Sequence, residues 1–317
     1  MTPATDSPME GLNIHRRLGR YELLRRIALS STAEVHLARP VEGGERVAIK
    51  RLLPHALEDP EQRARFTREI EAAMSQTHPG LARGLEVVDG RPGEPCLVMT
   101  YVEGPTLAEL LTDGRGVAPQ GALVHAAIAL ATSMEALHGG RGGARVHGDI
   151  SARNVVARGD GAFTLLDLGS SAGEGAEAMD AGTPRYVCPE RRGGGPLTTR
   201  GDVYSAGVLL WELTMGRRWP IDGPPAATST DTHLGALIER CLSETPDARP
   251  ANASALRALL GEPGPDTREA WLRWTGATTE VVTPQVSATQ GALAWVALIG
   301  ALTVATATAA WFIAQVG

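Results

Sequence analysis

Three polar side chains that carry oxygen atoms follow one another closely near the middle of the chain. Asp149 is followed five residues later by Asn154, and Asp167 opens the triplet Asp-Leu-Gly. A single aspartate is usually a solvated or capping residue, but two carboxylates and an amide in this arrangement are suited to holding phosphates through Mg²⁺. These three residues are therefore candidates for a site that binds metal-bound phosphates.

Two apolar runs predict a small hairpin that positions these residues. The runs are 154–156 and 163–166, and the sequence Gly-Asp-Gly between them at 159–161 favours a turn. The three polar side chains are then expected at the ends of the hairpin arms.

A fourth candidate ends the apolar strand Val47-Ala48-Ile49-Lys50. Lys50 is the only lysine in the chain, and all the other residues among its 30 lysines and arginines are arginines. The wide planar fork of arginine does not replace a compact ammonium group in a tight phosphate pocket. The alternative is a surface lysine that ends a strand, but its solitary position favours a phosphate ligand.

These motifs and two others resemble those of the eukaryotic-type (Hanks-type) bacterial serine/threonine protein kinase family. The resemblance runs from about Tyr21 to Leu260, and it implies an α+β, bilobal fold with a small β-rich lobe, a larger helical lobe and a cleft for ATP and Mg²⁺. The matching stretches are 47–50, 147–154, 167–169, 182–190 and 246–250.

The resemblance implies a role for each polar candidate. Asp149 accepts the proton of the substrate hydroxyl, Asn154 and Asp167 hold Mg²⁺, and Lys50 pairs with the α and β phosphates. Arg153 supplies positive charge near the transferred phosphate.

The ion-pair partner of the lysine is expected on a helix over residues 60–77. Helical spacing cannot choose between Glu69 and Glu71. The resemblance places the partner at Glu69, from its distance to His78-Pro79.

The resemblance also implies which residues line the nucleotide cleft, on both sides of a hinge at residues 100–104. Met99 is the gatekeeper, and backbone groups near Tyr101 and Val102 meet the adenine. The further expected contacts are Ile27, Ala28, Ser30, Val35 and Ala48.

The sequence departs from the family at its glycine-rich loop. The positions of Gly-x-Gly-x-x-Gly-x-Val are held by Ala28, Ser30, Ala33 and Val35. The replacements are small, so the hairpin still covers the nucleotide, but their Cβ atoms restrict the backbone and weaken its contact with phosphate.

The loop around the predicted base departs too. Gly148 stands where the family usually has the arginine that clamps a phosphorylated activation loop, and Ser151 stands where serine/threonine kinases usually have lysine. We therefore expect activity without phosphorylation of the following segment, including Ser170 and Ser171.

Downstream residues favour a protein substrate within this resemblance. Thr183 favours serine or threonine over tyrosine as acceptor. Asp202 holds the backbone of the catalytic loop, and Arg249 pairs with Glu190. Small-molecule phosphotransferases of similar fold generally lack Glu190, Asp202 and Arg249, which makes that third function class less favoured.

The domain organisation follows from pattern and composition. An antiparallel meander is expected over 21–27, 34–38 and 46–53, and helices over 121–138, 202–215 and 267–274. The predicted parts are a flexible arm at 1–20, a kinase domain at 21–261 with small lobe 21–99, hinge 100–104 and large lobe 105–261, a linker at 262–290 and a transmembrane tail at 291–317.

The tail carries no charged residue from Gly291 to Gly317, with Trp295 and Trp311 near its two ends. Such a helix is long enough to span a bilayer, and tryptophans suit its interfaces. Arg268 and Arg273 precede it, so the expectation is a single-pass membrane protein with a cytoplasmic kinase domain. A buried core helix is the alternative.

Charge and cysteine content argue against a nucleic-acid-binding protein, a disulfide-stabilised protein and a zinc protein. The formal net charge is -6 and no basic run is present, so no nucleic-acid partner is expected. The three cysteines are widely spaced and odd in number, which predicts reduced thiols and neither a disulfide frame nor a zinc site. No cleaved signal peptide is expected.

The sequence therefore predicts a membrane-anchored kinase that transfers phosphate from ATP to serine or threonine of protein substrates. The alternative is a pseudokinase that acts as a membrane-tethered scaffold. Retention of Asp149, Asn154 and Asp167 argues against the alternative, and the lost glycines argue for it.

Overall fold

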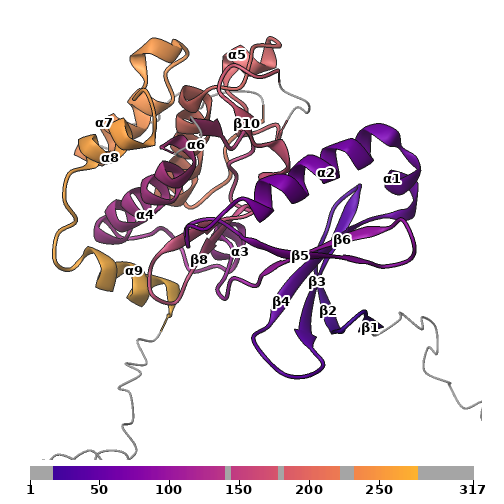
Figure 1. The fold of residues 1–317 in the computed structure, drawn as a ribbon. Helices are drawn as coiled ribbons and strands as arrows, with labels where there is room; N and C mark the ends of the chain where they lie inside the picture. The colour runs from indigo at the N-terminus through magenta and orange to yellow at the C-terminus, as the bar shows by residue number, and fades with distance from the viewer. Residues whose placement is uncertain (1–16, 140–143, 178–181, 222–231, 278–317) are drawn as a thin grey trace, which may run out of the picture. The chain divides into compact units, whose positions relative to one another are not determined.

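The described chain forms a small lobe built on a β-sheet and a larger lobe built from helices (Figure 1). The computed structural model describes residues 17–139, 144–177, 182–221 and 232–277, and all of them belong to a unit that ends at Thr278. The bilobal α+β architecture expected from the sequence is confirmed.

The small lobe contains an antiparallel sheet of six strands in the order β1-β2-β3-β4-β6-β5. Strands β2, β3 and β4 form the predicted meander, and Gly43 and Gly44 have φ values of 90° and 128° in the turn before β4, a backbone region that favours glycine. The strands are β1 Arg17–Leu18, β2 Tyr21–Leu29, β3 Ala33–Pro40, β4 Val47–Leu52, β5 Gly84–Asp89 and β6 Pro95–Thr100.

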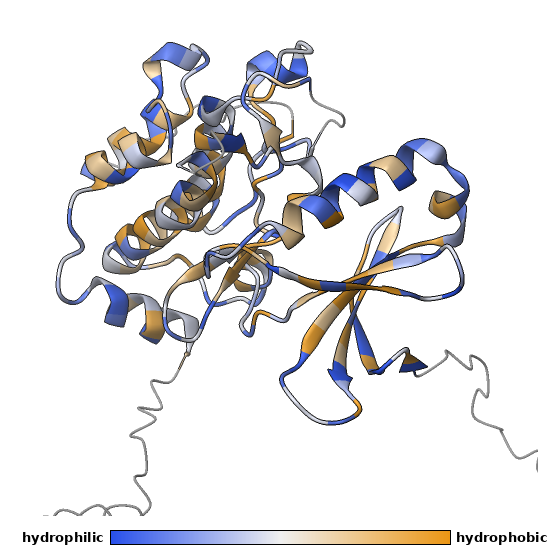
Figure 2. Cartoon of the chain, in the orientation of Figure 1, coloured by the Kyte–Doolittle hydropathy of each residue, from blue (hydrophilic) through white to orange (hydrophobic). Residues whose placement is uncertain are grey.

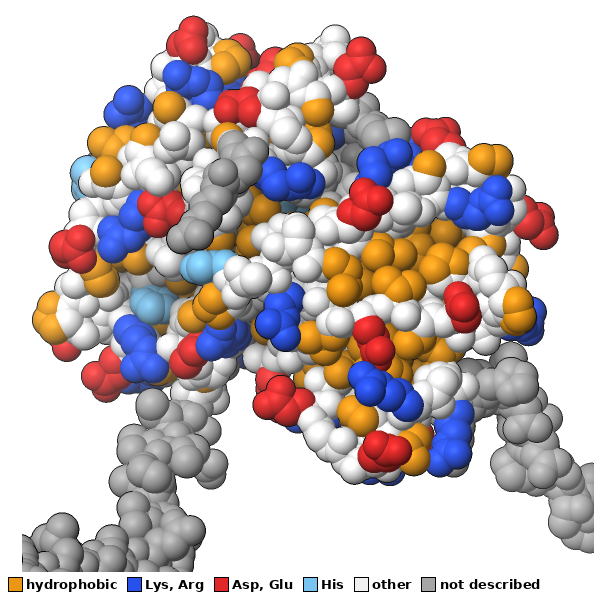
Figure 3. All heavy atoms as spheres, viewed as in Figure 1, with side chains coloured by type: hydrophobic (Ala, Val, Ile, Leu, Met, Phe, Trp, Pro, Cys, Tyr) orange, Lys and Arg blue, Asp and Glu red, His pale blue; other side chains and the backbone are white. Residues whose placement is uncertain are grey.

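Both faces of this sheet bury apolar side chains. Neighbouring residues of a strand point to opposite faces, so Leu97 joins the cluster under the helices, whereas Val98 joins the cluster on the other face. On that other face Leu85 and Val88 of β5 are only partly covered, and Figure 3 shows apolar side chains at the surface of the small lobe.

The flexible arm expected over residues 1–20 ends earlier than predicted. Leu18 is buried in the cluster on the outer face of the sheet, and it pairs with Tyr21 between β1 and β2. Burial of an apolar side chain holds these residues to the sheet, which the polar composition around Leu18 concealed. Residues 1–16 lie outside the described part.

Two helices follow β4, α1 Pro54–Glu58 and α2 Pro60–Met74. Pro60 occupies the first turn of α2, where its missing N–H costs nothing, and Asp59 caps the helix by accepting hydrogen bonds from the backbone of Glu61 and Gln62. One face of α2 buries Phe66, so the helix is fixed against the sheet. Helix α2 ends three residues before the predicted boundary at residue 77.

The large lobe is organised around two helices that are buried along most of their length, α4 and α6. Figure 2 shows α4 coloured mainly as hydrophobic, as expected for a helix surrounded by protein. The helices are α3 Leu107–Thr112, α4 Gln120–His138, α5 Pro189–Arg192, α6 Thr199–Met215, α7 His233–Cys241, α8 Ala253–Leu260 and α9 Thr267–Thr275.

Short strands and single turns complete the lobe. The predicted hairpin is confirmed as β8 Val155–Ala157 paired with β9 Phe163–Leu165, with Val156 opposite Thr164. The other short elements are β7 Arg145–Val146, β10 Ala172–Gly173, and the 3-10 turns η1 Leu168–Ser170 and η2 Pro246–Ala248.

Helix α9 corrects the linker predicted at 262–290. A short helix was expected here, but Trp271 is 0% exposed and packs in the core of the large lobe, with its ring 5.1 Å from that of Phe163. The described part of this segment therefore belongs to the large lobe, because the buried indole ties it to the hairpin.

No helix within the described residues is long and apolar enough to cross a membrane. The transmembrane tail predicted at 291–317 lies outside those residues.

Candidate active site

The side chain of Lys50 joins the two lobes. Its Nζ atom lies 2.5 Å from Oε1 of Glu69 on α2 and 3.1 Å from Oδ1 of Asp167, which follows β9. Three candidates from distant parts of the sequence thus meet at one point. Lys50 and Glu69 are largely buried there, while Asp167 keeps 44% of its side-chain surface exposed.

The sheet and the helix explain why these residues meet. Lys50 pairs with Val35 on β3, so both side chains face the α2 side of the sheet. Glu69 is buried on α2 and Glu71 is exposed. The structure therefore shows that the ion-pair partner of Lys50 is Glu69 and not Glu71, a choice that helical spacing alone left open.

The carboxylates keep Lys50 charged. Burial lowers the pKa of Lys50, but Asp167 and Glu69 outweigh burial and raise it above its ordinary value. Burial raises the pKa of Glu69 to about 7 against the pull of Lys50. The pKa of Asp167 is lowered, because the attraction of Lys50 exceeds the effect of burial.

Asp167 has a strained backbone. Its φ is 55°, the left-handed region, and it is the only residue other than glycine with positive φ in the described ranges. Its Oδ1 atom accepts a hydrogen bond from the amide of Gly169 at 3.2 Å. Strain of this kind persists where surrounding contacts hold it, and here it falls on a predicted metal ligand.

Asp149 and Asn154 form a second pair in the site. Asn154 Nδ2 donates to Oδ2 of Asp149 at 2.8 Å and to its carbonyl oxygen at 2.9 Å, and the amide of Thr183 donates to Oδ1 at 2.7 Å. Burial raises the pKa of Asp149, and the contacts with Thr183 oppose that shift. Asp149 is thus oriented by donors on both oxygens.

The remaining oxygen atoms fit a magnesium ion. Asn154 uses its amide nitrogen in these bonds, and among the described residues its Oδ1 and the Oδ2 of Asp167 accept no hydrogen bond. No group of three or more His, Cys, Asp or Glu side chains suited to a metal occurs in the described ranges. One carboxylate and one amide suit Mg²⁺, which takes its other ligands from phosphates and water.

The predicted adenine wall lies on the same face of the sheet as Lys50. Ala48 is two residues from Lys50 on β4 and pairs with Met99 on β6, and Ala28 of β2 pairs with Val35. Residues that pair across strands share a face, so these side chains line one surface. The other expected contacts are Ile27, Tyr101 and Val102, which are half-buried.

The loop that replaces the glycine-rich sequence is closed by its own serine. Ser30 Oγ accepts hydrogen bonds from the amides of Thr32 and Ala33 at 3.3 and 3.0 Å, and it donates to the carbonyl oxygen of Ala33 at 3.1 Å. The amides of this turn are therefore engaged within the loop. The sequence showed the loss of glycine but not this closure.

Asp202 holds the loop that carries Asp149, as predicted. Its carboxylate accepts hydrogen bonds from the amides of His147 at 2.6 Å and Gly148 at 2.9 Å, and from Nε2 of His138 at 3.0 Å. The His138 donor assignment follows because its Nδ1 accepts from the amide of Ala253. The pKa of buried Asp202 is lowered, because these donors outweigh burial.

The predicted pair of Glu190 and Arg249 is confirmed. The guanidinium group contacts both carboxylate oxygens, at 2.7 and 2.9 Å, and the Arg249 side chain is fully buried. This bidentate contact ties the start of α5 to the residue that follows η2.

Two further arginines lie near the predicted base. Arg153 is exposed, makes no ion pair or hydrogen bond with its side chain in the described chain and lies outside the Lys50 cluster, and its role near the transferred phosphate stays a prediction. Arg191 was not predicted, but its guanidinium group donates to the carbonyl oxygen of Gly148. Its only sequence signal is its position after Pro189-Glu190.

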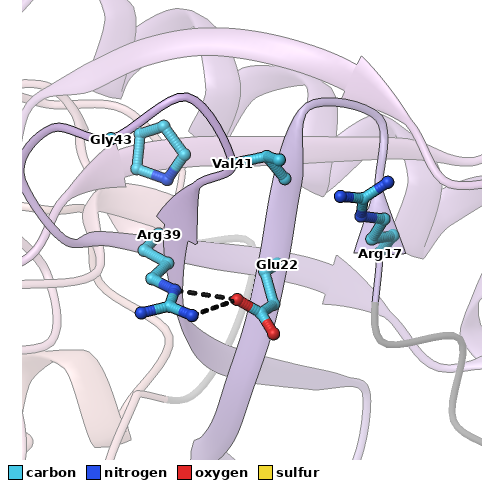
Figure 4. Close-up of a pocket in the computed structure, with 6 residues that line it drawn as sticks. Arg17, Glu22, Arg39, Val41 and Gly43 are labelled. Carbon is cyan, nitrogen blue, oxygen red and sulfur yellow. Dashed lines mark hydrogen bonds and ion pairs between the residues drawn. The ribbon is translucent and has the colours of Figure 1, made fainter.

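A hollow elsewhere on the small lobe holds none of the predicted site residues (Figure 4). It lies over β1, β2 and the end of β3, where Arg39 and Glu22 form an ion pair at 2.7 Å. The lining residues are Arg17, Glu22, Arg39, Pro40, Val41 and Gly43.

Comparison with known proteins identifies the family and the fold of this chain. Residues 21–259 match the protein kinase domain family. A probable serine/threonine-protein kinase of Streptomyces coelicolor is 33% identical over 261 residues, which cover 78% of this chain and 38% of that protein. The serine/threonine-protein kinase PkaA of the same species is 34% identical over 251 residues, covering 72% of this chain and 45% of its own.

A solved structure shows the same fold. The PknI kinase domain of Mycobacterium tuberculosis superposes with a TM-score of 0.61 at 23% identity, over 78% of this chain and 98% of that domain. The chain spans less than half the length of the two curated relatives.

Proposed function

This chain belongs to the Hanks-type serine/threonine protein kinase family of bacteria, and on that premise we propose that it transfers the γ-phosphoryl group of ATP to serine or threonine hydroxyls of protein substrates. The observation that carries the proposal is the contact of one ammonium, Lys50 Nζ, with both Glu69 and Asp167. It supports the proposal because the residue proposed to bind phosphate in one lobe contacts the residue proposed to bind metal in the other.

Each residue of the site has a separate role in the proposed phosphoryl transfer. Lys50, held by Glu69, binds the α and β phosphates. Asn154 and Asp167 hold Mg²⁺, which neutralises charge on the phosphates when bound. The acceptor hydroxyl oxygen bonds to the γ-phosphorus as the bond to the ADP oxygen breaks, and its proton passes to Asp149. Most of the catalytic effect comes from positioning and charge neutralisation.

The test is phosphate transfer from labelled ATP to casein and to myelin basic protein, with Asp149→Asn as the control. We expect transfer by the wild-type chain and a loss of at least two orders of magnitude in the variant, since a positioned base contributes about 10²–10⁴-fold. Equal rates in both proteins would remove the enzyme proposal.

The pseudokinase remains a second candidate because of one observation, the loop closed by Ser30. Amides engaged within the loop contribute less to phosphate binding, so nucleotide affinity is expected to be low. Thermal unfolding with ATP, with and without Mg²⁺, separates the candidates. Ligand at one hundred times its dissociation constant stabilises the fold by about 2.7 kcal/mol, and a scaffold that binds no nucleotide shows no shift.

We also propose that residues 291–317 anchor the chain as a single-pass protein with the kinase domain in the cytoplasm. The support is the uncharged stretch from Gly291 with Trp295 and Trp311 near its ends, preceded by Arg268 and Arg273. Extraction of membranes at alkaline pH tests this proposal. The full chain should stay with the membrane and a chain ending at residue 290 should not.

A further inference from the structure

Two tryptophans of the large lobe contact two arginines, Arg185 and Arg217. The rings of Trp211 and Trp219 meet edge to face at 4.9 Å, and both are buried. The guanidinium group of Arg217 lies 5.4 Å from the centre of the Trp211 ring, and that of Arg185 donates to the carbonyl oxygen of Trp219. Contacts with the two neighbouring tryptophans therefore hold Arg185 and Arg217 in place.

The segment that carries Arg185 also contacts Asp149, the predicted base. The amide of Thr183 donates to Asp149, and Arg185 follows two residues later. Arg218 Nη1 lies 3.4 Å from the hydroxyl of Tyr186, the residue after Arg185, and Arg153 lies between Asp149 and Asn154 in the catalytic loop. We call these four arginines the arginine surface: Arg153, Arg185, Arg217 and Arg218.

The arginine surface carries more positive charge than its neighbours neutralise. Within the described ranges only Arg218 has a carboxylate within ion-pair distance, Glu212 at 3.4 Å. Glu212 is fully buried and already accepts from the Tyr186 hydroxyl at 2.5 Å and from the Trp219 amide at 2.8 Å. Three of the four guanidinium groups therefore have no carboxylate partner among the described residues, in a chain whose formal net charge is -6.

We propose that this surface selects protein substrates with aspartate or glutamate next to the acceptor serine or threonine, an inference that rests on the proposed function. Guanidinium forks bind carboxylates in a planar, two-bond geometry, and a positive rim repels basic segments. The body of the chain is acidic, so without this surface an acidic segment meets net repulsion. Two or three exposed pairs give about a tenfold preference at low salt.

The test measures binding separately from transfer. Three fluorescent peptides of equal length carry one serine flanked by glutamate, alanine or arginine, and their dissociation constants for the full chain are measured by anisotropy. We expect the glutamate peptide to bind about tenfold more tightly than the alanine peptide and the arginine peptide to bind least. The difference should shrink in 1 M salt, where the screening length falls from about 10 Å to about 3 Å.

A matched pair of variants tests whether the arginine surface causes the preference for the glutamate peptide. Arg217→Gln with Arg218→Gln removes two charges from the arginine surface, and Arg25→Gln with Arg63→Gln removes two from exposed small-lobe sites that form no ion pair in the described chain. The first variant should lose most of the preference and the second should keep it. Because Arg218 lies beside buried Glu212, the single change Arg217→Gln replaces the first variant if thermal melting shows that it is unfolded, and it should lose part of the preference.

The outcomes for selectivity and for function differ. An arginine peptide that binds as tightly as the glutamate peptide overturns the inference, and so does a preference that survives in the arginine-surface variant. Phosphate transfer is then measured on the same peptides. Selective binding without transfer supports the inference and removes the proposed function, whereas transfer with no preference for the glutamate peptide removes only the inference.

Discussion

The guanidinium group of Arg191 on α5 donates a hydrogen bond to the carbonyl oxygen of Gly148, the residue before Asp149. Gly148 has a φ of 80°, and a Cβ atom there would lie 2.9 Å from the carbonyl oxygen of Ser170. The family usually has arginine at this position, and here an arginine contacts the position from a different element. Arg191 of α5 thus contacts the catalytic loop at a position that has no side chain of its own.

Replacing Gly148 by alanine should destabilise the fold. The left-handed backbone costs roughly 1–2 kcal/mol for a residue with a Cβ atom, and the close approach to Ser170 adds to that cost. The measurement is urea unfolding, with Gly194→Ala as the control, since Gly194 has a φ of 85° and no heavy atom within 4 Å of a Cβ. Equal losses in the two variants would contradict the predicted contact.

Thr183→Val should move the acid limb of the rate profile to higher pH. Burial raises the pKa of Asp149, and the hydroxyl and amide of Thr183 oppose that rise. A proton acceptor must be ionised, so the rate falls as pH falls through the raised pKa, and losing the hydroxyl raises that pKa further. The pH dependence of kcat/KM checks this, with Thr183→Ser expected to behave as wild type. A shift to lower pH contradicts it.

Ionisation of Asp149 is needed for catalysis, but it lowers the stability of the fold. A carboxyl group whose pKa is higher in the folded state than in the unfolded state stabilises the fold below the unfolded value of 3.8. That contribution disappears as pH rises through the folded pKa, so ionising Asp149 for catalysis reduces stability.

Ser30→Gly should tighten ATP binding several-fold. The change frees the amides of Thr32 and Ala33 from the serine hydroxyl and restores glycine flexibility at the loop. Ser31→Gly, which adds the same flexibility without freeing those amides, is the matched control. The measurement is the dissociation constant for ATP with Mg²⁺. If both variants bind ATP equally more tightly, the gain comes from flexibility alone and not from the freed amides.

Trp271→Ala should destabilise the large lobe by about 3–5 kcal/mol, the usual cost of removing a fully buried large aromatic side chain. Arg273→Ala, on the exposed side of α9, is the control. The chain cut after residue 261 should lose at least as much stability as Trp271→Ala, and the chain cut after residue 277 should lose little. Urea midpoints measure all four, and a loss below 1 kcal/mol for Trp271→Ala would show that α9 is dispensable.

The polar residues of the site could be predicted because their types are restricted by chemistry. Lys50 and Asp202 make the contacts expected of them with Glu69 and with the backbone of the catalytic loop, since an ammonium or a carboxylate at these positions has few substitutes. Helical spacing left Glu69 and Glu71 open and the resemblance chose Glu69, which the structure shows to be the buried residue of the two.

Other features depend on contacts that leave little local pattern. The closure of the loop by Ser30 is a short-range bond among residues whose small size was the only visible signal. Helix α9 was expected as an interruption of a linker because Pro and Gly surround it, and only its packing against Phe163 made it part of the lobe. Arg191 reaches Gly148 across 43 positions, which no periodicity encodes.

Lys50 also determines how the protein responds to covalent reagents. It is the only side-chain amine in the sequence, and two acidic neighbours keep it protonated and mostly enclosed. A protonated amine is a poor nucleophile, so acylation of this lysine requires it first to leave Glu69 and Asp167. The labelling rate of this single lysine thus reports how often it leaves its two carboxylate partners, with no background from other lysines.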